Sequence, residues 1–190
     1  TPVLTQAARD LPPSAPMPQL DREVNPRMNF SGDLVKDFDP PNGPDPLLAL
    51  QEAAPAASPD GFNTPIFNFN GQGYTFVNPP DTVGDVGKNH YVQMINATDV
   101  AIYNKATAAL IQTFAFTSLG GCSTGNGDPI VLYDQMADRW FLSEFGPGNS
   151  LCTFVSQTPD PLGAYYSYQF TTPSFPDYPK YGIWPDAYYA

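Results

Sequence analysis

The second two-thirds of this chain alternates polar and apolar residues in short runs with the period of β-strands. The runs are rich in Val, Ile, Tyr, Phe and Trp, and Gly, Pro, Asn or Asp bounds them. Between Tyr74 and Phe170 they read YTFVN, YVQMIN, DVAIYN, ALIQTFAF, IVLYD, WFLSEF, LCTFVSQ and YYSYQF. Helical spacing is absent after Pro65, so the pattern predicts an all-β domain over residues 65–190.

Two polar segments join successive runs in the way that hairpin turns do. YNKATAALIQ connects the third run to the fourth, and FGPGNSLC connects the sixth to the seventh. We therefore expect consecutive strands to pair antiparallel with one another.

A repeat runs through the same region. Asp81, Asp128 and Asp177 are 47 and 49 residues apart, which is close to the length of one four-stranded propeller blade. Each is followed by a second aspartate and then by an aromatic residue that begins a strand; these are Asp85 and Tyr91, Asp134 and Trp140, and Asp186 and Tyr188. The repeat predicts a partial β-propeller of two blades and the start of a third, with a β-sandwich as the alternative. Because a propeller needs at least four blades, we expect the chain to be a fragment, completed by the remainder of the same polypeptide or by a companion chain.

Residues 1–64 differ from the rest because proline interrupts them throughout, as in LPPSAPMPQ, DPPNGPDP and AAPAASPDG. Proline removes amide donors and restricts the residue before it, so this segment is predicted to be an extended, propeptide-like arm with a short helix near Pro46–Ala54. Such an arm either wraps the domain or a neighbouring subunit, or serves as a spacer.

Charge, hydrophobicity and cysteine content limit the possible ligands and the cellular location of the protein. The 19 acidic and 8 basic residues give a net charge of −11, which argues against nucleic-acid binding. No apolar run of about 18 residues is present, so we expect no membrane span. Cys122 and Cys152 lack the spacing of metal ligands, which favours a disulfide and an extracellular or cell-surface location over two unrelated buried thiols.

Candidate chemistry is sparse, because no nucleophile, zinc-protease or phosphate-loop motif is present. His90 is the chain's only histidine, and Arg139 occupies its place in the next repeat, so we interpret His90 as structural. The repeated aspartates have three interpretations. They are residues of turns, they bind calcium through Asp81, Asp128 and Asn126, or Asp128 and Asp177 catalyse glycoside hydrolysis.

Aromatic residues crowd the last quarter of the chain, and their ordinary use is packing between blades. Rings left exposed would instead hold a carbohydrate or a protein partner, and Trp184 and Tyr188 are the candidates for this role. The face on which Glu144 lies is left open by the sequence.

Four strings carry a family resemblance: PPDTVGDVGKNHYVQMIN, DPIVLYDQMADRWFLSEF, SQTPDPLGAYYSYQF and FPDYPKYGIWPDAYYA. They resemble large, secreted, mostly uncharacterised bacterial proteins with a β-propeller-like ectodomain of the broad sialidase-like kind. The resemblance covers roughly residues 67–190 and supplies no catalytic residues, and the Ser-x-Asp-x-Gly-x-Thr-Trp box of sialidases is absent. We expect a secreted or cell-surface protein that acts by binding or assembly. The alternatives are a glycosidase and a structural subunit of an extracellular filament.

Overall fold

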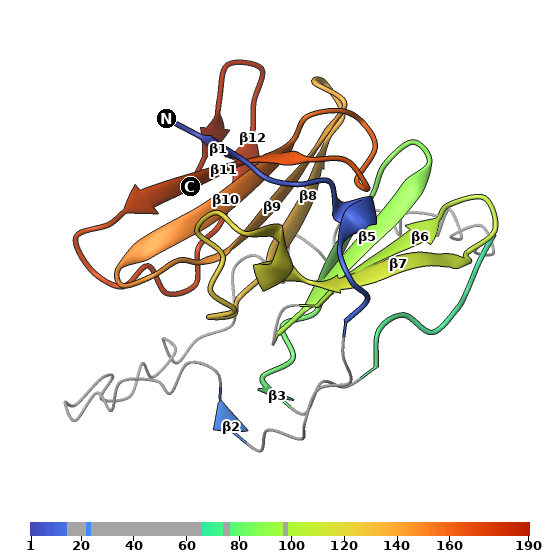
Figure 1. Ribbon diagram of the computed structural model, residues 1–190, viewed down its shortest axis with the longest axis horizontal. Helices are drawn as coiled ribbons and strands as arrows, with labels where there is room; N and C mark the ends of the chain where they lie inside the picture. Colours follow the sequence, from blue (N-terminus) through green and yellow to red (C-terminus); the bar gives the residue numbers. More distant parts are fainter. Residues whose placement is uncertain (15–21, 24–65, 74–76, 97–98) are drawn as a thin grey trace, which may run out of the picture. The chain divides into compact units, whose positions relative to one another are not determined.

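A computed structural model of the chain describes residues 1–14, 22–23, 66–73, 77–96 and 99–190 (Figure 1). Antiparallel β-sheets dominate this part, and its helical residues form only two 3-10 turns, η1 (Ala8–Asp10) and η2 (Phe116–Leu119). The prediction of an all-β domain is confirmed. None of the described helices is long and apolar enough to cross a bilayer.

Sheet 1 contains four consecutive strands in the order β4-β5-β6-β7, all antiparallel. They are β4 (Val83–Val86), β5 (His90–Ile95), β6 (Asp99–Asn104) and β7 (Leu110–Ala115). Asn104 sets the turn after β6, because its Oδ1 accepts hydrogen bonds from the amides of Ala106 at 2.9 Å and Thr107 at 3.1 Å. This is the first hairpin that the sequence predicts.

Sheet 2 repeats the arrangement and adds one strand at its edge, in the order β1-β11-β10-β9-β8. Its strands are β8 (Ile130–Asp134), β9 (Arg139–Phe145), β10 (Ser150–Ser156), β11 (Tyr165–Thr171) and β1 (Val3–Leu4). The turn from β8 to β9 is stabilised in the same way as the turn after β6. Asp134 Oδ1 accepts hydrogen bonds from the amides of Met136 and Ala137, each at 2.9 Å. The hairpin predicted at FGPGNSLC joins β9 to β10.

Two short pairs complete the described structure. β12 (Gly182–Ile183) pairs antiparallel with β13 (Tyr188–Tyr189), and β2 (Arg22–Glu23) pairs parallel with β3 (Val77–Asn78). The predicted helix at 46–54 and most of the arm lie outside the described residues. Within the described ranges no sheet closes on itself.

One apolar core joins the two sheets. Alternate residues of β5 and β6 meet alternate residues of β8, β9 and β10, as the period of a strand requires. Sixteen buried side chains form the core: Ala8, Leu11, Val92, Met94, Val100, Ile102, Phe114, Phe116, Leu119, Val131, Tyr133, Trp140, Leu142, Cys152, Phe154 and Tyr165. Each sheet thus buries one of its faces against the other sheet.

A hydrogen bond and a close van der Waals contact hold the two sheets together where β4 meets β8. Asp85 Oδ2 accepts a hydrogen bond from the Tyr133 amide at 2.7 Å. Gly87 follows β4 directly and lies against the Trp140 indole, so a Cβ at this position would be 2.7 Å from a ring carbon. A glycine is needed here because the indole of the next sheet fills the space of a side chain.

Cys122 and Cys152 form the predicted disulfide, with their Cα atoms 5.6 Å apart. The bond spans 30 residues and attaches the loop after η2 to β10. Closing a loop of this length contributes about 3–4 kcal/mol through the entropy of the unfolded chain.

The strand register tests which parts of the sequence repeat are structurally equivalent. Tyr91 pairs with Val86, Trp140 with Tyr133, and Tyr188 with Ile183, so each aromatic residue stands opposite the last or next-to-last residue of the preceding strand. The second aspartates are different. Asp85 lies inside β4, Asp134 ends β8, and Asp186 falls in the turn between β12 and β13.

The contact between Gly87 and Trp140 yields the first prediction. Gly87→Ala is expected to lower the free energy of unfolding by about 1–3 kcal/mol, because the added methyl group overlaps an indole that packing holds in place. Gly73→Ala is the matched control, since no described residue other than its chain neighbours comes within 4 Å of its Cβ position. Urea unfolding of both variants measures the difference. Equal midpoints would contradict the packing described here.

Candidate functional site

The starts of the three repeats meet around one polar pocket with a volume of about 170 Å³. Its lining comes from residues 81–83, 128–130 and 178–180. Asp81 and Asp128, both named from the sequence, therefore lie in the same site. Asp177 is not among the lining residues, and its neighbour Tyr178 takes the corresponding place.

The backbone confirms which residues correspond around the polar pocket. Asp81, Asp128 and Tyr178 have φ angles of 38°, 51° and 60°, the left-handed region that non-glycine residues rarely adopt. Asp tolerates this conformation better than most residues, whereas an aromatic residue is unusual there. The third repeat is thus shifted by one residue from the alignment based on its aspartate.

Asn96 connects the two aspartate turns at the polar pocket. Its Nδ2 donates to Asp81 Oδ2 at 2.7 Å, and its Oδ1 accepts from the Asp128 amide at 3.0 Å. The Asn96 side chain is buried at the end of sheet 1, so the link is shielded from water. Burial also raises the pKa of Asp81 above its ordinary value. The alignment of the three repeats did not point to Asn96, because Asn96 stands outside the repeated positions.

The polar pocket combines two carboxylates with one ammonium group. Lys180 Nζ lies 3.6 Å from the centre of the Tyr178 ring, a cation–π contact that holds the lysine at the pocket wall. Asn126 is not in the lining and donates instead to the Gly146 carbonyl at 3.1 Å. Among the described residues, no three His, Cys, Asp or Glu side chains gather as metal ligands. Calcium binding by these residues stays a prediction.

A second, apolar pocket of about 340 Å³ lies on the face of sheet 2 that points away from sheet 1. We call this surface the far face. Its pocket is lined by Phe141, Leu151, Thr153, Val155, Tyr168, Phe170, Tyr181, Tyr188, Tyr189 and Ala190. Phe141 alternates with the core residues Trp140 and Leu142, which is why it points to the opposite side of the sheet.

The β12–β13 segment covers part of the far face through specific contacts. Tyr188 donates its hydroxyl hydrogen to Asp134 Oδ2 at 2.7 Å, and the Tyr181 hydroxyl is hydrogen-bonded to Ser143 Oγ at 2.7 Å. Both tyrosine rings pack on Phe141, with centroid distances of 5.0 and 5.3 Å. Of the two residues proposed to bind a ligand, Tyr188 thus forms the pocket wall. Trp184 is exposed and lies outside the lining.

His90 occupies the junction of turn and strand that the repeat predicts. It begins β5 as Arg139 begins β9, and it lines neither pocket. Burial lowers the pKa of the His90 imidazole, and the negative charge of Asp160 opposes this effect. The interpretation of His90 as a structural residue stays a prediction.

Glu144 is the buried charge whose role the sequence did not reveal. Its side chain is 1% exposed, and its Oε1 accepts from Ser123 Oγ at 2.6 Å, the Thr124 amide at 2.8 Å and the Gly125 amide at 3.2 Å. Oε2 is buried and has no hydrogen-bond partner among the residues that the structure describes. Glu144 stands opposite Cys152 in the sheet, so carboxylate and disulfide together attach the same glycine-rich loop to sheet 2.

Comparison of the chain with protein-family models, curated proteins and solved structures found no match. The resemblance to secreted bacterial propeller proteins therefore stays an expectation.

Glu144 yields a prediction on pH. Burial raises its pKa in the folded protein, and the three hydrogen bonds only partly offset this effect. The stability that Glu144 contributes is therefore complete below its unfolded pKa of about 4.5, and it is lost as the pH rises through the raised folded value. We expect the advantage of the natural protein over Glu144→Gln to shrink as the pH rises, by at most about 1.4 kcal/mol per pH unit.

Glutamine is a suitable replacement because its amide oxygen can accept the same three hydrogen bonds without a charge. Urea unfolding of both proteins across a pH series measures the difference in stability. A difference that is constant with pH would show that Glu144 keeps an ordinary pKa in the fold.

Proposed function

We propose that this chain is part of a secreted or cell-surface β-propeller-like protein that acts by binding or assembly. Sheets 1 and 2 are then neighbouring blades, and β12–β13 is the first hairpin of a third. The strand order supports the proposal, because each sheet contains four consecutive antiparallel strands and the first of them, β4 or β8, lies at an edge of its sheet.

The observation that carries the proposal is the repeated contact between successive units. Trp140 is the second residue of β9, the second strand of sheet 2, and packs toward sheet 1 beside Gly87. Tyr188, at the equivalent position of the third unit, packs toward sheet 2 on Phe141. The β12–β13 hairpin thus approaches the far face in the way that sheet 2 approaches sheet 1.

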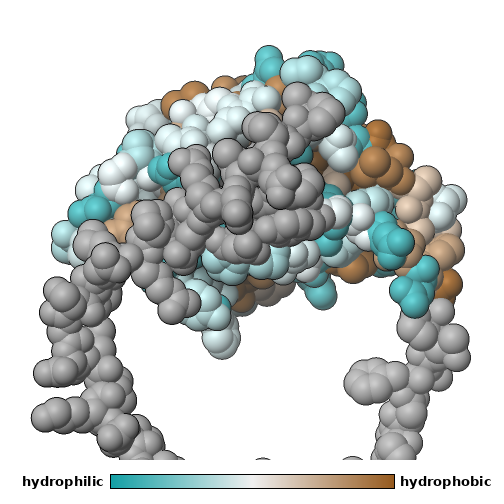
Figure 2. Space-filling view, turned by 90° about the horizontal axis from the view of Figure 1, so that it is seen from below, coloured by the Kyte–Doolittle hydropathy of each residue, from teal (hydrophilic) through white to brown (hydrophobic). Residues whose placement is uncertain are grey.

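The apolar surface of the far face fits a further blade. The hairpin leaves Phe170 and Tyr189 exposed beside the apolar pocket. Hydrophobic side chains also reach the surface among polar ones in the view of Figure 2. Exposed aromatic surface of this kind is typical of a contact with a partner, because its burial is favourable.

The incomplete third blade, the disulfide and the net charge indicate the partner and the cellular location that we propose. The remainder of the same polypeptide, or a companion chain, would supply the third blade. The disulfide favours an oxidising, extracellular environment, and the net charge of −11 argues against nucleic acid. A carbohydrate or another extracellular protein would then be the ligand of the completed domain.

The test compares two substitutions in two forms of the protein. Phe170 and Leu110 are both 55% exposed, but only Phe170 lies on the far face. In the isolated chain, Phe170→Asp and Leu110→Asp are expected to change stability by at most about 0.5 kcal/mol. In the protein isolated from its natural source, Phe170→Asp alone is expected to lower the urea midpoint, because the carboxylate becomes buried without a partner.

Intact mass under reducing and non-reducing conditions accompanies this test. A polypeptide well above 20.7 kDa, or a companion chain, is expected. A natural protein of 20.7 kDa without a companion would refute the third blade.

A glycosidase is the second candidate, and the presence of Asp81 and Asp128 in one polar pocket favours it. If the two carboxylates of the polar pocket react, Asp81→Asn and Asp128→Asn are each expected to abolish glycoside hydrolysis without unfolding the protein. A folded natural protein that hydrolyses no glycoside would exclude this candidate.

A further inference from the structure

Asp128 and Pro129 form an Asp-Pro peptide bond at the wall of the polar pocket. Peptide bonds of this kind are sensitive to acid for two chemical reasons. The aspartate carboxylate can attack its own backbone carbonyl carbon and close a small cyclic anhydride. The prolyl nitrogen belongs to a tertiary amide without a hydrogen, so it accepts a proton more readily than an ordinary amide nitrogen and leaves as an amine.

The backbone is strained at this bond. The φ angle of Asp128 is 51°, in the left-handed region, whereas a residue before proline favours an extended backbone. Contacts on both sides hold the strained conformation. The Asp128 amide donates to Asn96 Oδ1 at 3.0 Å, the Gly127 carbonyl accepts from the Phe145 amide at 3.1 Å, and β8 begins at Ile130. Cleavage after Asp128 would release this strain, because the two ends could then relax independently.

A second carboxyl group, that of Asp81, lines the same pocket as Asp128 and Pro129. Asn96 ties the two aspartate turns together, since its Nδ2 donates to Asp81 Oδ2 at 2.7 Å and its Oδ1 binds the Asp128 amide. The other charged group of the lining is Lys180. Burial raises the pKa of Asp81 and so favours its protonated form, which is the form that a proton donor requires.

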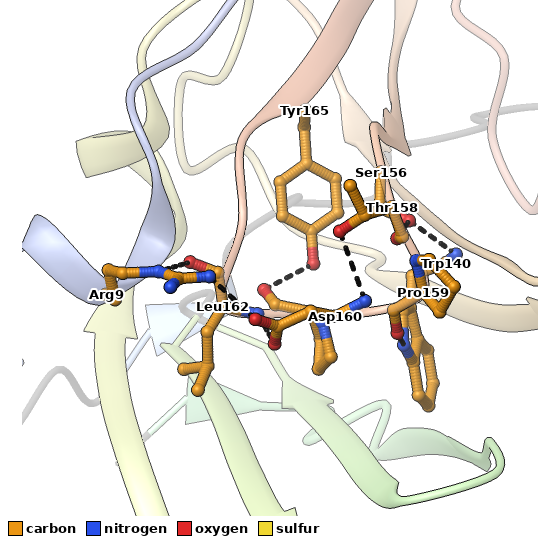
Figure 3. Close-up of polar contacts among 9 residues, drawn as sticks. Arg9, Trp140, Ser156, Thr158, Pro159, Asp160, Leu162 and Tyr165 are labelled. Carbon is orange, nitrogen blue, oxygen red and sulfur yellow. Dashed lines mark hydrogen bonds and ion pairs between the residues drawn. The ribbon is translucent and has the colours of Figure 1, made fainter.

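The chain carries the same dipeptide in an unstrained conformation at Asp160 and Pro161 (Figure 3). The φ angle of Asp160 lies outside the left-handed region. Its carboxylate is also held away from chemistry. Oδ1 accepts from the Leu162 amide at 3.0 Å, and Oδ2 forms an ion pair with Arg9 at 2.6 Å. The two sites share the dipeptide, so the folded structure is what distinguishes Asp128 from Asp160.

We propose that the folded chain cleaves its own peptide bond between Asp128 and Pro129 in mild acid. The Asp128 carboxylate forms a bond to its backbone carbonyl carbon, and the bond from that carbon to the Pro129 nitrogen breaks. Asp81 gives its proton to the departing nitrogen. Water then opens the anhydride to two carboxylates, and the protons released return to Asp81 and convert the Pro129 amine to an ammonium group. The reaction consumes one water molecule, and nothing is oxidised or reduced.

The fold survives this cleavage. Cys122 precedes the bond and Cys152 follows it, so the disulfide keeps the two products together. No described strand is interrupted, because β7 ends at Ala115 and β8 begins at Ile130. The product is a protein of two chains, of which the second begins with Pro129 at the polar pocket.

Intact mass of the full chain after incubation at about pH 5 tests the cleavage. Without reduction the mass is expected to increase by one water molecule, and reduction is expected to separate fragments 1–128 and 129–190. Fragment masses show which of the four Asp-Pro bonds in the sequence is cut. Cleavage after Asp128 is expected to be about 5 to 150 times faster than after Asp160 in the same molecule, the range that backbone strain of this kind implies.

Three variants and one change of solvent complete the test. Asp128→Asn should abolish the cut, Asp81→Asn should slow it and weaken its rise between about pH 7 and about pH 5, and Asp160→Asn should leave it unchanged. In urea, where the chain is unfolded, the preference for Asp128 over Asp160 should disappear.

An uncut folded chain, or equal cleavage after Asp128 and Asp160 in the folded chain, would overturn the proposal. A preferred cut after Asp128 that keeps its rate and pH dependence in Asp81→Asn would overturn the role of Asp81. These measurements need no glycoside and no partner chain, so their outcome is separate from that of the propeller and of the glycosidase.

Discussion

Burial of one face of sheet 2 against sheet 1 is the interaction on which the rest of the structure depends. Neither sheet can bury its apolar side chains alone, because a single antiparallel sheet leaves both of its faces in water. Their contact aligns β4 with β8, and this alignment brings Asp81 and Asp128 to a common pocket. The polar pocket is therefore a consequence of how the sheets pack.

The two faces of sheet 2 show how one strand serves two interfaces. Trp140 and Leu142 enter the core, whereas Phe141 between them lies on the far face. Glu144 shares the side of Trp140 and Leu142, where it holds the loop that also carries the disulfide.

The sequence predicts the strands well and the sites poorly, for a physical reason. Alternation and turn residues are local, so the seven runs from YVQMIN onward all coincide with strands, and the disulfide is confirmed. The pattern did not predict β4, because its four residues, VGDV, include a glycine and an aspartate, which are uncommon in strands. Asp85 is present because it accepts a hydrogen bond from sheet 2. Tyr178, Asn96 and Glu144 owe their roles to contacts across strands, which sequence spacing cannot show.

Residues 1–14 show a different limit of local patterns. Their proline-rich surroundings predict an arm, yet Ala8 and Leu11 belong to the central core. Because the core includes residues so distant in sequence, the stability of the domain depends on the attachment of residues 1–14 to the two sheets. The far face needs no such segment, because residues next to sheet 2 in sequence already cover part of it. The core thus depends on a segment that is distant in sequence, whereas the far face is covered by residues that adjoin sheet 2 in sequence.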